Sequence, residues 1–300
     1  MTLLPDSPDL FLAYAGMETD LIFTHGMELP GFASYPLMET IKGQRLLQSY
    51  FTAMIDLGRE AGTGVILESP TWVAHRDRGA AIGYAAERLG ALNAAAVGLM
   101  KEVREGAAGV PVVLSANIGP RADAYAPTEQ MSVAEAEAYH LEQVSALRGV
   151  DVISGYTLTY AAEAAGIARA AKACGLPVVI AFTVELDGCL PTGMSVADAI
   201  AEVDAQTGAY PAYYMINCAH PDHFEGVLDG GAWMNRLGGL VANASRCSHA
   251  ELDEAEVLDD GNPEELGQQL AGLRARFPQI RVLGGCCGTD MRHMRAIAAS

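Results

Sequence analysis

The feature of this sequence that most restricts its fold is a regular alternation between short apolar runs and longer alanine-rich stretches. The short runs have the length and composition of buried strands, and the long stretches have the apolar spacing of amphipathic helices. The expected strands are Leu10–Ala15, Gly64–Leu67, Val112–Ala116, Asp151–Ser154, Val178–Phe182, Tyr213–Ile216, Gly239–Val241 and Arg281–Leu283. The expected helices are Glu39–Glu60, Arg76–Glu105, Ser132–Leu147, Ala161–Ala173, Ser195–Thr207, Pro221–Gly230, Pro263–Phe277 and a last one from Thr289 towards Ser300.

Eight strand–helix units in 300 residues predict a (β/α)8 TIM barrel, expected to span residues 1–300 as a single domain. A doubly wound open sheet is the main alternative. Against it, no Gly-x-Gly-x-x-Gly follows the first expected strand, and the sequence contains no Walker-type phosphate loop. The acidic, irregular stretch Ala244–Pro263 is expected to be a long loop after the seventh strand.

Charge and apolar content restrict the partners. A formal net charge of −18 argues against nucleic acid and anionic membranes, which attract basic surfaces. No apolar run approaches the ~18 to 20 residues that span a bilayer, and the N-terminus lacks the basic region of a secretory signal. Six cysteines are too few for a disulfide scaffold, so a cytoplasmic, reducing setting is expected. The expected partners are small molecules, and a homo-oligomer is compatible with the sequence.

Three of the six cysteines are expected to meet at one rim of the barrel. The carboxyl ends of the strands form the catalytic rim of such a fold. Cys218 follows the sixth expected strand by two residues, and Cys286 and Cys287 come just past the eighth. Three convergent thiolates suit Zn²⁺ and leave a fourth coordination position for a substrate. The other cysteines are expected elsewhere, at a helix end on the opposite rim or far along loops: Cys174, Cys189 and Cys247.

The adjacent pair Cys286 and Cys287 is a poor candidate for a disulfide. Neighbouring Cα atoms are ~3.8 Å apart, which is closer than relaxed disulfide geometry allows. Glycines at 284, 285 and 288 relieve crowding and would let both side chains turn towards one metal ion. The alternative interpretation is a tight turn of small buried residues.

These residues carry a family resemblance. The segment Val282-Leu-Gly-Gly-Cys-Cys-Gly-Thr289 resembles the C-terminal zinc motif of the homocysteine S-methyltransferase family, and Ile216-Asn-Cys218 resembles its middle motif. Further similar segments are Gly16-Met-Glu-Thr-Asp-Leu21, Ser115-Ala-Asn-Ile-Gly-Pro-Arg121 with Asp123 and Tyr125, and Val241-Ala-Asn-Ala-Ser245.

The resemblance implies a zinc-bearing β/α barrel that transfers a methyl group from a sulfonium, quaternary ammonium or folate donor to homocysteine sulfur. Such a reaction would belong to methionine biosynthesis. A cobalamin or methylfolate module does not fit in 300 residues, so a small-molecule donor is favoured. The catalytic and metal-binding residues expected from the resemblance are Cys218, Cys286 and Cys287.

This sequence differs from the family at the two positions where family members use carboxylates to bind the amino group of homocysteine. The corresponding positions carry Tyr14 and Tyr156, and a phenol brings no charge at neutral pH. Glu18 is a possible replacement for the lost charge. The acceptor is therefore expected to be homocysteine or a related thiol.

The expected substrate-binding residues combine aromatic and polar groups at the strand ends. Tyr14, Trp72 and Tyr156 could form an aromatic wall that suits a sulfonium or quaternary ammonium donor by cation–π contact, although ordinary rim packing is an equal alternative. The full expected set is Tyr14, Glu18, Trp72, Asn117, Tyr156 and Asn217.

The sequence therefore predicts a zinc-dependent S-methyltransferase with a thiol acceptor, and two other functions stay open. A zinc barrel lyase or hydrolase would need a general base, for which Glu68, Asp187 and His75 are the candidates. A non-catalytic metabolite-binding homologue is the other. His75, His220 and His223 could replace a thiol as metal ligand, or could simply be surface or supporting histidines.

Overall fold

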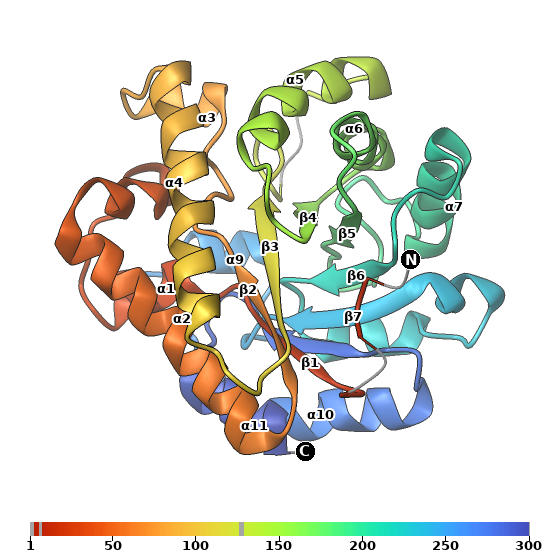
Figure 1. Ribbon diagram of the computed structural model, residues 1–300. Coiled ribbons are helices and arrows are strands. Elements are labelled where there is room, and N and C mark those ends of the chain that lie inside the picture. Colours follow the sequence, from red (N-terminus) through yellow and green to blue (C-terminus); the bar gives the residue numbers. More distant parts are fainter. Residues whose placement is uncertain (1–2, 6–7, 126–128, 300) are drawn as a thin grey trace.

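The computed structural model describes residues 3–5, 8–125 and 129–299. Its strands form a closed parallel barrel in chain order, in which Leu12 of the first strand pairs with Leu283 of the last (Figure 1). The eight strands are β1 (Phe11–Tyr14), β2 (Gly64–Glu68), β3 (Val112–Ile118), β4 (Val152–Leu158), β5 (Val178–Phe182), β6 (Tyr214–Asn217), β7 (Leu237–Ala242) and β8 (Val282–Gly285). The predicted (β/α)8 barrel is confirmed.

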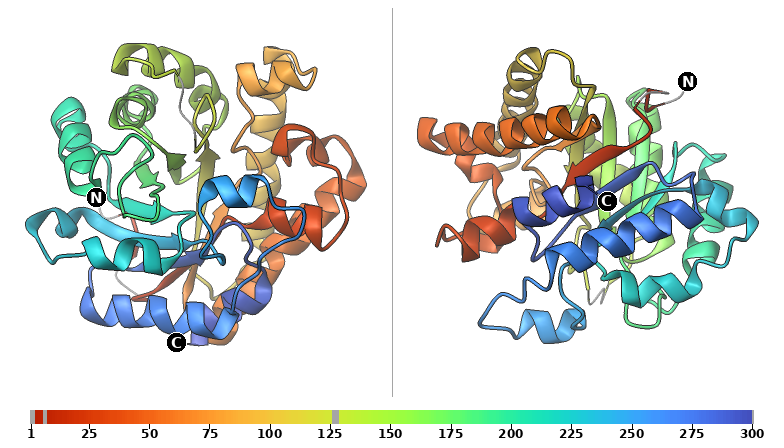
Figure 2. Two further views of the ribbon diagram at one scale, coloured as in Figure 1. Left: turned by 180° about the vertical axis from the view of Figure 1, so that it is seen from behind. Right: turned by 90° about the horizontal axis from the view of Figure 1, so that it is seen from below.

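Helices surround the barrel on its outer side (Figures 1 and 2). The α-helices are α1 (Met17–Phe23), α2 (Ile41–Ala61), α3 (Arg76–Ala81), α4 (Ala86–Glu105), α5 (Val133–Ala146), α6 (Ala161–Ala173), α7 (Val196–Thr207), α8 (Pro221–Phe224), α9 (His249–Asp253), α10 (Pro263–Arg276) and α11 (Met291–Ala299). Short 3-10 helices are η1 (Pro30–Phe32), η2 (Tyr35–Glu39), η3 (Glu225–Val227) and η4 (Ala232–Arg236). The last helix, α11, contacts both α10 and α2, so the ring of helices closes where β8 meets β1.

Two expected helices are wrong in extent. The expected helix over 76–105 is broken into α3 and α4, because the chain turns through Gly83 with a φ of 88°. The expected helix over 221–230 is only α8 followed by η3, and Gly230 again has a positive φ.

Two short helices at the catalytic rim, α1 and α9, are absent from the sequence-based expectation. They follow β1 and β7. In α9, the Ser248 side chain accepts a hydrogen bond from Glu251 N and the Glu251 carboxylate reaches back to Ser248, which is a capping box. The stretch Ala244–Pro263 was expected to be a loop throughout, but this cap stabilises a short helix within it.

Alternate residues of each strand face the inside of the barrel. In β1, Phe11 and Ala13 pack inside, whereas Leu12 packs between the sheet and the helices. The interior is filled by side chains from every strand, including Phe11, Ile66, Val113, Val179, Met215 and Val282. The barrel is therefore a solid support, and any substrate space must lie above it at the rim.

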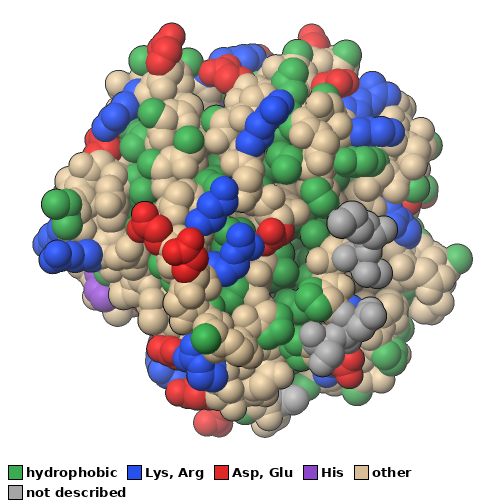
Figure 3. Space-filling model, viewed as in Figure 1, with side chains coloured by type: hydrophobic (Ala, Val, Ile, Leu, Met, Phe, Trp, Pro, Cys, Tyr) green, Lys and Arg blue, Asp and Glu red, His purple; other side chains and the backbone are tan. Residues whose placement is uncertain are grey.

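The outer surface carries mixed charges. Figure 3 shows acidic and basic side chains interspersed among apolar ones on the face seen in Figure 1. Among the helices of the described residues, none is long and apolar enough to cross a membrane.

Candidate active site

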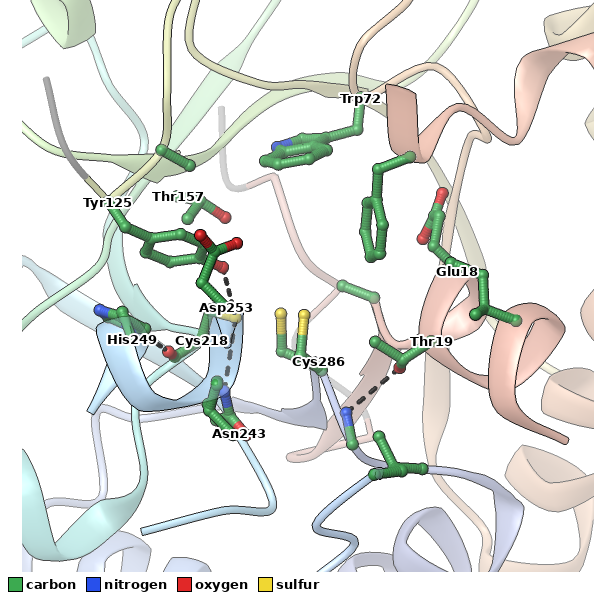
Figure 4. Close-up of a pocket in the computed structure, with 18 of the residues that line it drawn as sticks. Glu18, Thr19, Trp72, Tyr125, Thr157, Cys218, Asn243, His249, Asp253 and Cys286 are labelled. Carbon is green, nitrogen blue, oxygen red and sulfur yellow. Dashed lines mark hydrogen bonds between the residues drawn. The ribbon is translucent and has the colours of Figure 1, made fainter. Parts of the chain in front are cut away.

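Cys218, Cys286 and Cys287 come together at the carboxyl ends of β6 and β8, and we call them the cysteine cluster (Figure 4). Their sulfur atoms all lie within 4.8 Å of one another. Cys218 and Cys286 are buried, and Cys287 is partly exposed. The structure thus brings together the three thiols that strand position alone predicted to converge.

Backbone hydrogen bonds between neighbouring strand ends fix the cluster. Cys218 N donates to Val241 O (2.9 Å), and Cys286 N donates to Ala242 O (2.7 Å). Both partners belong to β7, which lies between the two strands that carry the cysteines. Cys218 itself has a φ of 54°, a left-handed conformation that costs a non-glycine residue on the order of 1 kcal/mol. The fold therefore holds the Cys218 thiol in a direction that a relaxed strand end would not give.

The glycines beside the cysteine pair allow close backbone approach. A Cβ on Gly284 would lie 1.9 Å from Ala13 O, and one on Gly285 would lie 2.4 Å from Thr289 Oγ1. Only Gly288 of the three has a positive φ, at 75°. The glycines thus relieve crowding with β1 at Gly284 and with the segment that follows β8 at Gly285.

Polar side chains surround the sulfur atoms. The amide nitrogens of Asn243 and Asn217 donate to the sulfurs of Cys218 (3.8 Å) and Cys286 (3.9 Å). The Tyr125 hydroxyl lies 3.2 Å from the Cys218 sulfur (Figure 4). Donors of this kind stabilise thiolates and orient metal ligands.

The thiols influence one another's ionisation. Hydrogen bonds from Cys286 and Cys287 hold the pKa of Cys218 well below its usual value. The same hydrogen bonds raise the pKa of Cys286 and of Cys287. Three thiolates this close repel one another, so full ionisation of the cluster needs a cation.

The donor set fits a metal ion. Zinc–sulfur bonds of ~2.3 Å in a tetrahedron place sulfurs roughly 3.8 Å apart, and the three sulfurs here all lie within 4.8 Å of one another. The sulfurs are soft ligands, and they come from a rigid rim rather than from a long loop. The cysteine cluster could therefore hold a soft divalent ion with one position facing the pocket.

The cluster opens into a pocket of about 430 Å³. Its apolar lining includes Ile22, Phe23, Phe32, Trp72, Leu252 and Leu258. The rings of Phe32 and Trp72 meet edge to face, with centroids 6.0 Å apart. Figure 4 shows Trp72 and Glu18 on one side of the cysteine sulfurs and Tyr125 and His249 on another.

Four of the expected substrate-binding residues line this pocket: Glu18, Trp72, Asn117 and Tyr156. Glu18 accepts a hydrogen bond from Ser34 Oγ (2.5 Å), and burial raises the pKa of its carboxyl. Asn117 is 8% exposed, and its Oδ1 has no partner among the described residues. Asn117 therefore brings a buried amide oxygen without a partner among the described residues to the pocket wall.

The structure turns the other two, Tyr14 and Asn217, away from the pocket. The Tyr14 hydroxyl donates to Thr289 O (3.0 Å), and its ring stacks on Tyr50 with centroids 6.3 Å apart. Asn217 is fully buried and binds Thr157 through both ends of its amide (2.9 Å each). The expected aromatic wall is corrected accordingly: Phe32, and not Tyr14, joins Trp72 and Tyr156.

Tyr156 lines the pocket, but its hydroxyl is already engaged. It donates to Glu68 Oε1 (3.0 Å), a carboxyl that is 6% exposed, and Glu68 Oε2 has no partner among the described residues. Burial raises the pKa of Glu68 to about 7. Glu68 is not among the described residues that line the pocket.

The three histidines singled out in the sequence also lie away from the pocket lining of the described residues. His75 Nδ1 pairs with the Tyr139 hydroxyl (2.8 Å), and burial lowers its pKa to about 3. His220 Nδ1 accepts from Asp222 N, and burial lowers its pKa to about 4, while His223 donates to Arg246 O (2.9 Å).

His249 lines the pocket and was missed. Its Nε2 donates to Cys218 O (2.8 Å), its Nδ1 lies 3.1 Å from Glu185, and its ring stacks on Tyr125 with centroids 4.1 Å apart (Figure 4). A lone histidine in a stretch expected to be a loop carries no spacing signal. Tyr125 and Asn243 stood in segments that resembled family motifs, but neither had an assigned role.

With the geometry described, comparison with known proteins decides the family. A family model described as homocysteine S-methyltransferase matches residues 15–300. The chain belongs to the homocysteine S-methyltransferase family. Membership in this family supports methyltransferase activity with a homocysteine-type acceptor.

Two solved structures share the fold of this family member. Both are the homocysteine methyltransferase MmuM from Escherichia coli, in its oxidized form (TM-score 0.76) and its metallated form (TM-score 0.75). Each is 21% identical and covers 98% of this chain and 97% of that chain. A sequence comparison with curated proteins finds no match.

Proposed function

We propose that this member of the homocysteine S-methyltransferase family uses Zn²⁺ at Cys218, Cys286 and Cys287 to methylate a thiol. The donor would be a small sulfonium or quaternary ammonium compound, and the acceptor would be homocysteine or a related thiol. When bound, Zn²⁺ would lower the pKa of a thiol in its fourth coordination position, because the cation favours the charged form. The observation that carries the proposal is the opening of a three-thiol cluster into a largely apolar pocket.

The residues around the cluster would hold the negative charge of the sulfurs. Tyr125, Asn243 and Asn217 lie within hydrogen-bonding distance of cysteine sulfurs, and the first two also line the pocket. These hydrogen bonds would hold the three cysteine sulfurs in place as metal ligands while a substrate enters the pocket.

The other side of the pocket would bind the donor. The Phe32–Trp72 corner offers ring faces and edges to a sulfonium or ammonium group, and Glu18 adds negative charge. A confined pocket brings the methyl group and the acceptor sulfur together and limits competing water.

The lyase or hydrolase alternative loses support from the positions of its candidate bases. Glu68 accepts the Tyr156 hydroxyl and His75 pairs with the Tyr139 hydroxyl, and the Asp187 carboxylate accepts a hydrogen bond from Cys189 N (3.0 Å). None of the three is among the described residues that line the pocket. A general base would have to lie within hydrogen-bond reach of the substrate.

A methyl-transfer screen tests the proposal. S-methylmethionine, glycine betaine and dimethylsulfoniopropionate would each be paired with homocysteine and with thiols that lack an amino group, using zinc-loaded protein. We expect a thioether product from at least one pair, detected by mass spectrometry. A zinc-loaded chain that gives no product above the level of a cysteine-cluster variant would contradict the proposed function.

A further inference from the structure

The pocket wall contains an arginine, Arg78, that pairs with no carboxylate of the residues that the structure describes. Arg78 of α3 is half-buried and lines the pocket. Two other arginines of this region are paired: Arg76 of the same helix with Glu142 (3.2 Å), and Arg121 with Asp77 (2.7 Å). Among the described residues, no hydrogen bond or ion pair reaches the Arg78 guanidinium.

The rest of the charged wall is acidic. Glu18, Asp123, Asp253 and Asp259 line the pocket, and Arg78 is the sole lysine or arginine among its described lining residues. Residues 249–260, which we call the acidic segment, contain six acidic residues and no lysine or arginine. His249, at the start of that segment, is already bound to Cys218 O and Glu185.

This distribution of charge favours different positions in the pocket for the carboxylate and for the cation of a zwitterionic ligand. A ligand carboxylate is repelled along the acidic side, and its favourable place is the planar guanidinium, which binds carboxylates through two parallel hydrogen bonds. A ligand cation is favoured at the aromatic corner and at Glu18. The aromatic corner and Glu18 belong to η1, α1 and the β2–α3 connection, and Arg78 belongs to α3, whereas the cysteine cluster lies at β6 and β8.

We infer that Arg78 is the residue of this chain that binds a carboxylate of the methyl donor. This inference rests on the proposed function for the identity of the ligand as a methyl donor. The acceptor sulfur is assigned to the cysteine cluster at β6 and β8. Arg78 lies on α3, which directly follows the β2–α3 connection that carries Trp72, so it is assigned to the donor.

A matched pair of ligands tests the inference by binding alone. Dimethylsulfoniopropionate and ethyldimethylsulfonium differ only by the carboxylate. In calorimetric titrations of zinc-loaded protein, Arg78→Gln is expected to weaken binding of the carboxylate compound by roughly 10- to 100-fold, as for loss of a charge-assisted pair. Binding of ethyldimethylsulfonium should stay the same or tighten slightly. Arg78→Lys keeps the charge but not the planar guanidinium, so its affinity for dimethylsulfoniopropionate should lie between those of the unaltered protein and of Arg78→Gln.

Arg76→Gln is the matched control, because Arg76 lies on the same helix but pairs with Glu142 outside the pocket. Arg76→Gln should change the affinity for neither dimethylsulfoniopropionate nor ethyldimethylsulfonium. Equal weakening of both ligands by Arg78→Gln, no weakening at all, or failure of the unaltered chain to bind dimethylsulfoniopropionate would overturn the inference. If binding depends on Arg78 as expected while no donor and thiol pair gives a product, the proposed function fails and the assignment of Arg78 stands.

Discussion

Replacing Cys287 with serine is expected to reduce bound zinc from one ion per chain to well below that value and to abolish methyl transfer. Residues that merely support metal ligands change metal affinity by ~10- to 100-fold, so removal of one of three thiolate ligands should cost more than about 100-fold. Elemental analysis of protein purified under reducing conditions gives the stoichiometry, and competition with a chromophoric chelator gives the affinity.

Cys174→Ser is the control for this experiment. Cys174 caps the end of α6 on the opposite rim, so its replacement should leave both zinc content and activity unchanged. A Cys287→Ser protein that retains one tightly bound zinc would show that the cysteine cluster is not the metal site.

Replacing Glu68 with glutamine is expected to stabilise the protein at alkaline pH and to have little effect near pH 4. Burial raises the pKa of Glu68 from a usual value of 4.5 to about 7, so the folded chain keeps a proton that the unfolded chain releases. The free energy of unfolding therefore falls as pH rises from about 4.5 to 7, by about 3 kcal/mol once Glu68 is ionised. Glutamine cannot ionise, and its carbonyl oxygen can still accept the Tyr156 hydroxyl.

Urea unfolding at pH 4.5 and pH 8 measures this effect. The two proteins should have similar stability at the lower pH, and the glutamine variant should be the more stable at the higher pH. Glu102→Gln, on the exposed face of α4, should show no such pH-dependent difference. A Glu68→Gln protein whose stability differs from the parent by the same amount at both pH values would contradict the pKa assigned to Glu68.

The fold and the cysteine cluster could be predicted because the sequence shows where the strands end, and residues just past strand ends meet at one rim of a barrel. Cys218, Cys286 and Cys287 lie one or two residues past the end of a strand, and parallel strands in a barrel end on the same rim. The spacing of residues along two strands was therefore enough to place three thiols together.

The rest of the pocket could not be predicted, because it depends on where side chains point and on loop structure. Tyr14 lies at a strand end as Cys218 does, yet its hydroxyl binds Thr289 O and faces away from the pocket. His249 and Arg78 reach the pocket from α9 and α3, whose ends are set by local caps and glycine turns. Phe32 comes from η1, which carries no regular apolar spacing.

X-ray absorption at the zinc edge tests the central claim most directly, because it counts the sulfur atoms around the metal. In the zinc-loaded chain without substrate, three sulfur neighbours and one lighter atom are expected. Addition of a thiol acceptor that supports methyl transfer should raise the count to four sulfurs. A spectrum with fewer than three sulfurs, or one that the acceptor thiol leaves unchanged, would contradict a three-cysteine site with an open position for the thiol.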